Sequence, residues 1–478
     1  MSEVTFQNTL SRKAEPIVPT KGNVVGMYCC GPTVYAQAHI GNFRTFLNQD
    51  IMRRVLQTAG FKVLHVRNLT DVDDKTIARS IEEGKPLKAF TEHWTEVFQK
   101  DCERFNMLPP MVEPKATEHI EEQIAMIEQL IERGYAYASD DGSVYFRVSS
   151  FDEYGKLSRI KERQLLTDTP ADEEQGPVDS DEYTRDSAAD FVMWKSRKPT
   201  DGDVFWDSPW GQGRPGWHLE CSAMAMKYLG NNLDIHSGGV DLTFPHHENE
   251  IAQSECSCGH QKQFFKYWIH AAHLMVDGAK MSKSLNNFYT VDDIEAKGYA
   301  PVVLRYALTS GHYRQTINFT DDSLVAAQSA LVKLRKFSDD ILAAAGLKRS
   351  AVLKAIAKGK HAKDDWGVFA DAWTKLSHDM NVPAALGAIF TAIKAKPTGP
   401  DAAVAFHRII FALGYDLEQV VIEKPKVDAP EEVKAIAEKR WQAKQEKDWT
   451  AADALRDQLA AAGWKALDRK DGYDLEQL

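Results

Sequence analysis

The chain has 478 residues, of which 43% are hydrophobic and 27% charged, as in an ordinary globular protein of roughly two to four domains. No run approaches the roughly 20 apolar residues of a membrane span, and the N-terminus shows no secretory signal, so we expect a cytoplasmic protein. Separately, we expect a monomer. The formal charge of −11 argues against indiscriminate nucleic-acid binding, but it allows an RNA partner on a local basic surface.

The first part of the chain alternates between strand and helix signals. Residues 24–30 read as a short buried strand stopped by Gly31-Pro32, residues 43–57 as a helix, and residues 61–66 as a second strand. Another helix is expected from Asp73. This rhythm predicts a Rossmann-like parallel α/β sheet, in which ligands bind beyond the carboxyl ends of the strands.

Residues from about 134 to 209 break this rhythm, with a hairpin-like segment and an acidic stretch at 171–176, and they read as an insertion. Strand signals return at 233–236 and 264–270, and helical spacing runs from Ser323 to about Gly414. We therefore predict six regions: a Rossmann-like first half (1–134), an insertion (135–209), a second half of that domain (210–275), a loop-containing region (276–322), an all-α bundle (323–422) and a small C-terminal domain (431–478).

Two short strings far apart in the sequence favour a nucleotide site. Residues 38–42 read Ala-His-Ile-Gly-Asn, and residues 280–284 read Lys-Met-Ser-Lys-Ser. His39 could donate a hydrogen bond to a phosphate oxygen of ATP, and Lys280 and Lys283 could hold the departing pyrophosphate. Alone, each string is more readily a helix cap or a solvated loop. Together they predict ATP activation.

Metal-ligand residue types are scattered over three segments, at Cys30, at Cys221 and in the run Phe244-Pro245-His246-His247-Glu248-Asn249-Glu250. Thiolate, imidazole and carboxylate are the ligands that Zn²⁺ accepts, usually four at a time. His246 and Glu250 are four residues apart and would share one face of a helix.

Other candidate metal sites are weaker. His247-Glu248 resembles the start of a metalloprotease motif, but Ile251 replaces the second histidine. The segment 256–260, Cys-Ser-Cys-Gly-His, lacks the usual spacing, and we predict an exposed surface loop. Cys29 should point to the opposite face of its strand from Cys30, and Cys102 reads as plain packing.

The run from Gly213 to Cys221 places Gly and Pro around Trp217 and His218. It fits a binding pocket and, equally well, a turn followed by a helix with a buried tryptophan.

These strings resemble the cysteinyl-tRNA synthetase family of class I aminoacyl-tRNA synthetases. The resemblance is carried by the strand end Tyr28-Cys29-Cys30-Gly31, the run from Arg214 to Ser222, the Phe244 to Glu250 run, the two nucleotide signatures and Gly311-His312-Tyr313-Arg314. It covers residues 4–320 strongly and the helical remainder more loosely.

The resemblance implies an ATP-dependent ligase that joins L-cysteine to tRNA(Cys) through cysteinyl-adenylate, with one Zn²⁺ per chain and Mg²⁺ accompanying ATP. By position, its zinc ligands fall on Cys30, Cys221, His246 and Glu250. Its substrate pocket falls on Gly31, Thr70, Trp217, His236 and Asp241. Its ATP-binding and catalytic groups fall on His39, Gly41, Asn42, Lys280 and Lys283.

One position departs from the family pattern: the first signature usually ends in histidine, where this chain has Asn42. Asparagine donates a hydrogen bond but carries no proton to transfer, which leaves His39 with the larger share of any proton chemistry. The tail from Arg440 to Gly463 resembles the family's small anticodon-binding domain. A more basic candidate for the tRNA backbone, which reads equally well as a solvated helix face, is the set Lys348, Arg349, Lys354, Lys358, Lys360 and Lys363.

Two alternatives stay open. A ligase that joins cysteine to an amino sugar would share the zinc and phosphate signatures, but it should lack the more than 150 residues that follow Gly311. A non-catalytic RNA-binding paralogue would not need His39, Lys280 and Lys283.

Overall fold

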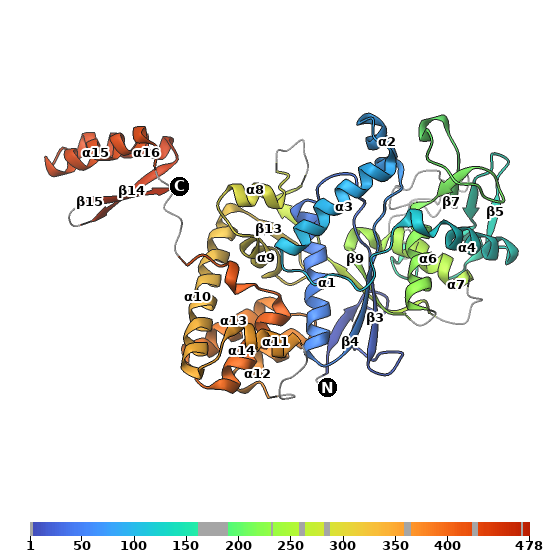
Figure 1. The fold of residues 1–478 in the computed structure, drawn as a ribbon, viewed down its shortest axis with the longest axis horizontal. Helices are drawn as coiled ribbons and strands as arrows, with labels where there is room; N and C mark the ends of the chain where they lie inside the picture. Colours follow the sequence, from blue (N-terminus) through green and yellow to red (C-terminus); the bar gives the residue numbers. More distant parts are fainter. Residues whose placement is uncertain are drawn as a thin grey trace. The chain divides into compact units, whose positions relative to one another are not determined.

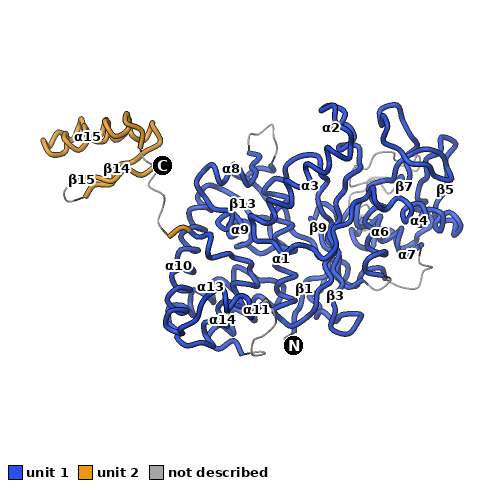
Figure 2. The backbone as a smooth tube through the Cα atoms, in the orientation of Figure 1, with its two compact units in different colours: residues 1–420 blue, residues 421–478 orange. Residues whose placement is uncertain are grey.

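The computed structural model describes residues 3–160, 190–230, 233–257, 263–281, 287–357, 365–422, 429–469 and 472–478. The chain divides into two compact units, residues 1–420 and 421–478 (Figure 2). No helix in these ranges is both long and apolar enough to cross a membrane.

The centre of the first unit is a parallel four-stranded sheet (Figure 1). Its strands lie in the order β10 (Phe265–Ala271), β9 (Leu233–Gly239), β3 (Val24–Cys29) and β4 (Lys62–Arg67). The helix α1 (Ile40–Thr58) connects β3 to β4. The strands are buried along most of their length, as expected when both faces of a parallel sheet are covered. The predicted Rossmann-like class is confirmed.

Alternate residues of β3 enter two different hydrophobic cores. Met27 and Cys29 belong to the core that also contains α1 and the later helices. Tyr28 and Cys30 belong to the core beneath the insertion. The prediction that Cys29 and Cys30 point to opposite faces is therefore confirmed, and only Cys30 faces the metal-type residues described below.

The insertion forms an antiparallel sheet of β5 (Ala136–Ala138), β6 (Val144–Phe146), β7 (Phe191–Ser196) and β8 (Gly213–Pro215). It packs near α4 (Ile120–Glu132), α6 (Trp217–Leu229) and α7 (His246–Ser257) (Figure 1). The strand β8 extends this sheet to Pro215, directly before α6. The acidic stretch at 171–176 lies outside the described residues.

Other elements of the first unit surround the sheet. They are β1 (Thr5–Asn8), β2 (Lys13–Pro16), α2 (Asp74–Glu82), α3 (Leu87–Arg104), β11 (Leu274–Val276), β12 (Ala279–Lys280), β13 (Ile317–Phe319), α8 (Val291–Ala296), α9 (Pro301–Thr309), α10 (Asp321–Ala345), α11 (Arg349–Ala357), α12 (Ala370–Ser377), α13 (Val382–Lys394) and α14 (Pro400–Leu413). Residues 321–413 are therefore largely helical, as predicted.

Buried arginines of α1 and α9 tie these layers together. Arg44 donates hydrogen bonds to the carbonyls of Leu308 at 2.8 Å and Gln315 at 2.5 Å, and Arg305 pairs with Asp50 at 2.6 Å. Each guanidinium satisfies its donors internally, as a buried cation must. Arg44 thereby fixes the 308–315 segment, which carries the Gly-His-Tyr-Arg string, against α1.

The second unit contains α15 (Glu431–Gln445), α16 (Trp449–Ala461), β14 (Trp464–Arg469) and β15 (Gly472–Gln477). The two strands form an antiparallel hairpin, and Val433, Ala437, Leu459 and Trp464 are buried in its small core. The two helices pack against each other and against this hairpin, so residues 429–478 fold around a core of their own.

One local prediction is wrong. Cys256 and Ser257 lie in the last turn of α7 and are buried, whereas the sequence suggested an exposed loop. Cys256 is a small apolar side chain that packs into the core beneath the insertion. The rest of the segment, 258–260, lies outside the described residues.

Candidate active site

The two nucleotide signatures meet at the start of α1. A Cβ added to Gly41 would lie 2.9 Å from Met281 Cε, the His39 and Phe288 rings lie 4.9 Å apart, and the Ile40 amide donates to the Tyr289 carbonyl at 3.0 Å. Met281 of the second signature and Phe288 and Tyr289, which follow that signature, therefore lie against the first. Lys280 ends β12 and is exposed, and Lys283 lies outside the described residues.

His39 and Asn42 cap α1 reciprocally. The Asn42 amide donates to His39 Nδ1 at 3.2 Å, and the His39 amide donates to Asn42 Oδ1 at 3.2 Å. Such a capping box satisfies two amides that a helix start leaves open. Both signature residues thus have a structural role, which the sequence had offered as the alternative to phosphate binding.

The tautomer of His39 follows from this cap. Burial lowers the pKa of His39 to about 4, although Asp241 opposes the change. The ring is then neutral near pH 7, and because Nδ1 accepts from Asn42, the proton sits on Nε2. His39 Nε2–H is therefore a hydrogen-bond donor.

Four metal-type donors converge below this site. Cys30 directly follows β3, Cys221 lies on α6, and His246 and Glu250 lie one turn apart on α7. Their ligand atoms all lie within 4.8 Å of one another, and all four side chains are buried. These are the four residues that the resemblance assigned to zinc.

The spacing of these donors fits a tetrahedral zinc ion. Two Zn–S bonds of about 2.3 Å at the tetrahedral angle place the sulfurs about 3.8 Å apart, and Cys30 Sγ lies 3.9 Å from Cys221 Sγ. His246 Nε2 lies 3.1 Å from Glu250 Oε1. The other ring nitrogen of His246, Nδ1, is hydrogen-bonded to His218 Nδ1 at 3.1 Å, which fixes the ring orientation.

The electrostatics favour the anionic form at two of the four donors, whereas burial and the neighbouring Cys221 and Glu250 raise the pKa of the Cys30 thiol. Burial alone would raise the pKa of Glu250, but His236 and His246 outweigh burial and lower it to about 2. Hydrogen bonds from Cys30 and His246 likewise overcome burial and lower the pKa of the Cys221 thiol to about 6. A deprotonated thiol and carboxylate are the forms in which a metal is bound.

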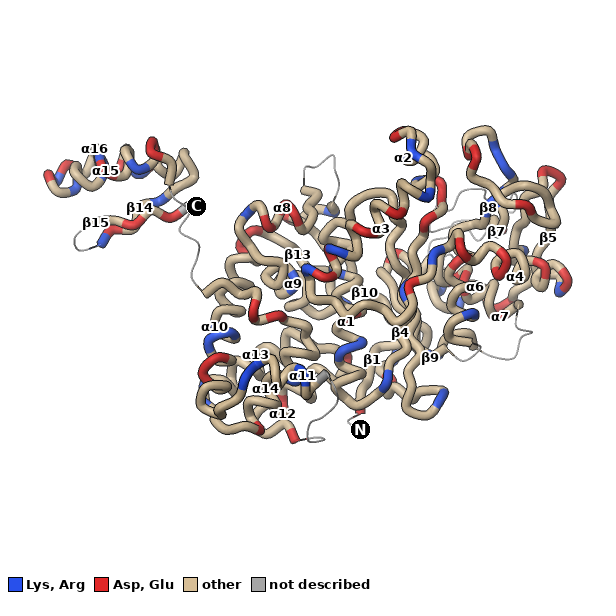
Figure 3. The backbone as a smooth tube through the Cα atoms, in the orientation of Figure 1, with Lys and Arg blue, Asp and Glu red and all other residues tan. Residues whose placement is uncertain are grey.

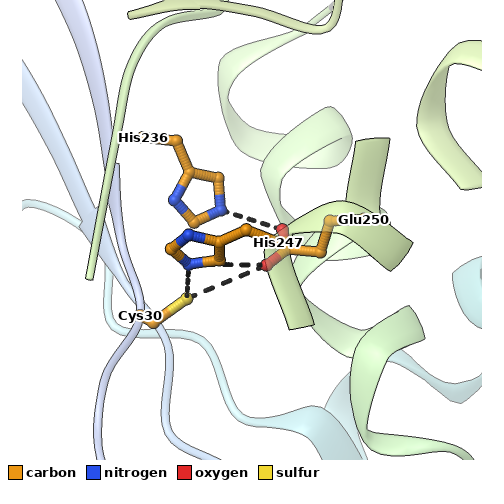
Figure 4. A group of neighbouring side chains, drawn as sticks. All are labelled: Cys30, His236, His247 and Glu250. Carbon is orange, nitrogen blue, oxygen red and sulfur yellow. Dashed lines mark hydrogen bonds and ion pairs between the residues drawn. The ribbon is translucent and has the colours of Figure 1, made fainter. Parts of the chain in front are cut away.

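Two further histidines face the same ligands. His236 Nε2 lies 2.8 Å from Glu250 Oε2, and His247 Nε2 lies 3.4 Å from Cys30 Sγ (Figure 4). Cys30, His236, His247 and Glu250 also satisfy the spacing of a metal site. This second set shares two ligands with the first, and it contains one thiolate instead of two.

The residues expected to bind substrate lie around this cluster. The partly buried Trp217 stacks on His246 with ring centroids 4.3 Å apart, and His236 touches Glu250. Trp217 begins α6, as the interpretation of a turn followed by a helix expects, and its place in a binding pocket stays a prediction. Asp241 is exposed and acts electrostatically on His39 of the first nucleotide signature.

Gly31 and Thr70 lie beyond the ends of β3 and β4. A Cβ on Gly31 would lie 1.7 Å from the Asn68 carbonyl oxygen, so only glycine fits there. Thr70 Oγ1 donates to Glu220 Oε2 at 3.0 Å.

Sequence reasoning missed five polar residues at this site. Asn68 and Glu220 are hydrogen-bonded to Gly31 and Thr70, and Thr9, His270 and His247 form a hydrogen-bonded series that ends at Cys30. His247 and Glu220 stood inside strings already singled out, and their polarity within buried helices was the available signal. No signal in the sequence pointed to Thr9, Asn68 or His270, because only the folded chain brings these residues to the site.

Comparison with known proteins agrees with this arrangement. Residues 16–329 match the family model of the class I (C) tRNA synthetase catalytic domain. The cysteine–tRNA ligase of Opitutus terrae is 52% identical over 472 residues, covering 98% of both chains. Those of Solibacter usitatus and Brachyspira hyodysenteriae are 43% and 40% identical, covering 98% and 99% of both chains.

Solved structures share the fold at low identity. The Mycobacterium tuberculosis methionyl-tRNA synthetase bound to methionyl-adenylate is 14% identical with a TM-score of 0.55, covering 83% of this chain and 89% of its own. The LeuRS ternary complex of Agrobacterium radiobacter is 10% identical with a TM-score of 0.58, covering 84% and 85%. The chain belongs to the cysteine–tRNA ligase family of class I tRNA synthetases.

Proposed function

We propose that the chain joins L-cysteine to tRNA(Cys) in two steps. The cysteine carboxylate attacks the α-phosphate of ATP, which releases pyrophosphate and forms cysteinyl-adenylate. A ribose hydroxyl at the 3′ end of tRNA then attacks the carbonyl carbon, and AMP leaves. The convergence of Cys30, Cys221, His246 and Glu250 within 4.8 Å, in the unit that also carries both nucleotide signatures, supports this function most directly.

In the first step, the nucleotide signatures stabilise charge on the phosphates. His39 donates from Nε2 to a phosphate oxygen as charge develops there, and Lys280 and Lys283 hold the departing pyrophosphate. Gly41 lets Met281 of the second signature lie against the α1 N-terminus, where the nucleotide would bind, and Asn42 supports His39. Mg²⁺ accompanies ATP.

Zinc held by Cys30, Cys221, His246 and Glu250 would supply a Lewis acid that favours the substrate thiolate over an alcohol. Serine differs from cysteine by one atom, and size alone separates such analogues by only about 1–3 kcal/mol. Ten-thousandfold accuracy takes roughly 5.5 kcal/mol. A contact that selects the thiolate supplies the missing free energy of discrimination against serine without an editing domain. The amino acid is oriented by the other pocket residues, Gly31, Thr70, Trp217, His236 and Asp241.

We assign tRNA binding to the helical region 323–422 and the small domain 431–478 of a cytoplasmic, monomeric enzyme. In the described residues, Figure 3 shows Lys and Arg interspersed with Asp and Glu over both units. Within the basic set proposed for the tRNA backbone, Arg349 is already paired with Asp339. Lys348 and Lys354 are exposed and available. The helices beyond Gly311 favour tRNA over an amino-sugar acceptor.

The test combines metal content with cysteine-dependent exchange of pyrophosphate into ATP. The enzyme should contain about one zinc per chain and exchange pyrophosphate with cysteine but not serine. A chain without exchange is a binding paralogue. If the chain exchanges pyrophosphate and transfers cysteine to an amino sugar but does not charge tRNA(Cys), it is the cysteine ligase with an amino-sugar acceptor.

A further inference from the structure

The carboxylate of Asp379, between α12 and α13, joins the helical region to earlier parts of the first unit. Its Oδ1 accepts from the Gln7 amide at 2.8 Å and from the Tyr313 hydroxyl at 2.5 Å. Its Oδ2 accepts from Arg314 Nη2 at 2.6 Å and from Arg314 Nε at 2.8 Å. One side chain of the helical region thus contacts β1 and two residues of the Gly-His-Tyr-Arg string.

The backbone at this position has an uncommon conformation. Asp379 and Met380 both have positive φ, 57° and 46°. For residues other than glycine this conformation costs of order 1–3 kcal/mol each, and it persists only where the surroundings fix it. The Asp379 amide donates to the Thr5 carbonyl at 2.8 Å, which is one such restraint. The chain bears this cost where a side chain leaves the helical region, which points to a role outside that region.

The turn that holds Tyr313 and Arg314 is fixed to the helix of the first nucleotide signature. Arg44, two residues after Asn42 on α1, donates from Nη2 to the carbonyls of His312 at 3.2 Å and Gln315 at 2.5 Å. Arg44 therefore holds the main chain of this turn, while Asp379 holds its side chains.

The same turn leads into the sheet that carries the second signature. The Tyr313 carbonyl accepts from the amide of Ala272, between β10 and β11, at 2.8 Å. The strand β13 follows the turn and pairs with β11, and β11 pairs with β12, which ends at Lys280. A shift of the turn would therefore move the second signature relative to the first.

We propose that Asp379 is a positioning residue for adenylate formation. By holding Tyr313 and Arg314, it fixes the turn between the two signatures, and so it sets how Lys280 and Met281 approach the start of α1. Asp379 acts through these residues and not on the substrates. This assignment rests on the proposed function, and it gives the helical region a part in the ATP step, before tRNA is charged.

The test is cysteine-dependent pyrophosphate exchange by the zinc-loaded enzyme without tRNA, titrated separately with ATP and with cysteine. Asp379→Asn keeps Oδ1 for Gln7 and Tyr313, but it turns an NH₂ group toward Arg314, which has only donors. We expect kcat/KM for ATP to fall roughly ten- to hundredfold, because a small misplacement of reacting groups costs that much. Zinc content and the KM for cysteine should stay within about twofold.

Companion variants separate positioning from folding. Tyr313→Phe breaks the contact at Oδ1 and should give the same ATP-selective loss. Asp379→Gly removes the carboxylate but suits the positive φ, so the backbone is retained and the loss should persist. Asp339→Asn on α10 is the matched control, because Asp339 pairs with Arg335 at 2.9 Å and with Arg349 inside the helical region, and exchange should not change.

A double variant tests whether Arg314 acts through Asp379. If it does, Asp379→Asn combined with Arg314→Gln should lose little more exchange activity than the weaker single variant. If the two single losses multiply in full, the residues act separately and the proposal is wrong.

Two further results would overturn the positioning role while wild-type exchange stands. One is unchanged exchange in Asp379→Asn and Asp379→Gly. The other is a matching loss of zinc content and of affinity for cysteine, which would show that Asp379 only supports the fold. A wild-type enzyme without cysteine-dependent exchange would instead overturn the proposed function, and this assignment with it.

Discussion

Met281 lies directly over Gly41: a Cβ placed on Gly41 would be 2.9 Å from Met281 Cε and 3.0 Å from two atoms of the His39 ring. Packed interiors do not absorb such an overlap without movement. Because position 41 has no side chain, Met281 of the second signature lies against α1 without a shift of its flexible end or of the His39 ring. Gly41 couples two segments that are 240 residues apart in the sequence.

Gly41→Ala should impair the ATP step more than it impairs folding. The added methyl pushes Met281 or His39 aside, and we expect cysteine-dependent pyrophosphate exchange to fall at least about tenfold, with the KM for ATP raised. Gly387→Ala on α13 is the control, because nothing lies within 4 Å of its Cβ position. Equal exchange rates in both variants would contradict the role given to this contact.

Cys221→Ser should remove the metal. Serine does not supply a thiolate, and the remaining three donors include only one sulfur, so zinc measured by atomic absorption should fall well below one per chain. Discrimination against serine in pyrophosphate exchange should fall with it. Cys102→Ser, at a buried cysteine that accepts from Arg67 at 3.6 Å, should keep its zinc. A Cys221→Ser enzyme with full zinc and full discrimination would refute metal selection of the substrate.

Asn42 combines two roles that different substitutions separate. Asn42→Ala removes the acceptor for the His39 amide and should lower the free energy of unfolding by about 1 kcal/mol, the usual cost of a lost cap. Asn42→Asp keeps that acceptor and the stability, but its charge repels phosphate, so exchange should fall at least about tenfold. Urea unfolding and exchange assays provide the two readouts. If the Asn42→Asp enzyme is as active as the wild type, Asn42 caps the helix and has no role at the phosphates.

The sequence predicted this site well where the information is local. The β3–α1–β4 order, the helical pairing of His246 with Glu250 and the opposite orientations of Cys29 and Cys30 all follow from period and spacing. The resemblance supplied the choice of His246 over His247, because two adjacent histidines are chemically equal in a sequence. Both face the same cluster, His246 through Glu250 and His247 through Cys30.

Non-local contacts were beyond such reasoning. Nothing near Asn68 in the sequence indicates that its amide joins Gly31 to Thr70, since the partner strand ends meet only in the folded sheet. The prediction of an exposed loop at Cys256 was wrong for a related reason. Its polar neighbours suggested solvent, whereas packing beneath the insertion decided its burial.

A second hydrogen-bond chain should tune zinc affinity. Thr9 Oγ1 lies 2.8 Å from His270 Nδ1, and His270 Nε2 lies 2.7 Å from His247 Nδ1. If Cys30 accepts as a thiolate, His247 donates from Nε2, and each earlier group donates to the next, starting from Thr9. Loss of such supporting bonds typically costs ten- to hundredfold in metal affinity.

Thr9→Val should therefore weaken zinc binding at least about tenfold in competition with a chromophoric chelator, whereas Thr9→Ser should bind as the wild type does. Both substitutions change the side-chain volume little, so we expect both variants to fold and the comparison to report the hydroxyl group alone. Identical zinc affinities in Thr9→Val and the wild type would show that this chain does not reach the metal ligands.

Acid should destabilise the helical region through His407, which lies away from the metal donors on α14. Burial lowers the pKa of His407 to about 4, while Ala403 and Ser338 hold its two ring nitrogens at 2.7 and 2.9 Å. Between about pH 6.5 and 4 the unfolded chain binds a proton at this residue and the folded chain does not, so stability falls as the pH falls through that window. At about 1.4 kcal/mol per pKa unit, the loss approaches about 3 kcal/mol below pH 4. His407→Gln does not titrate, so its free energy of unfolding, measured by urea denaturation, should fall less steeply than that of the wild type from pH 7 to pH 4.5. Parallel pH profiles for the two proteins would place the acid sensitivity elsewhere.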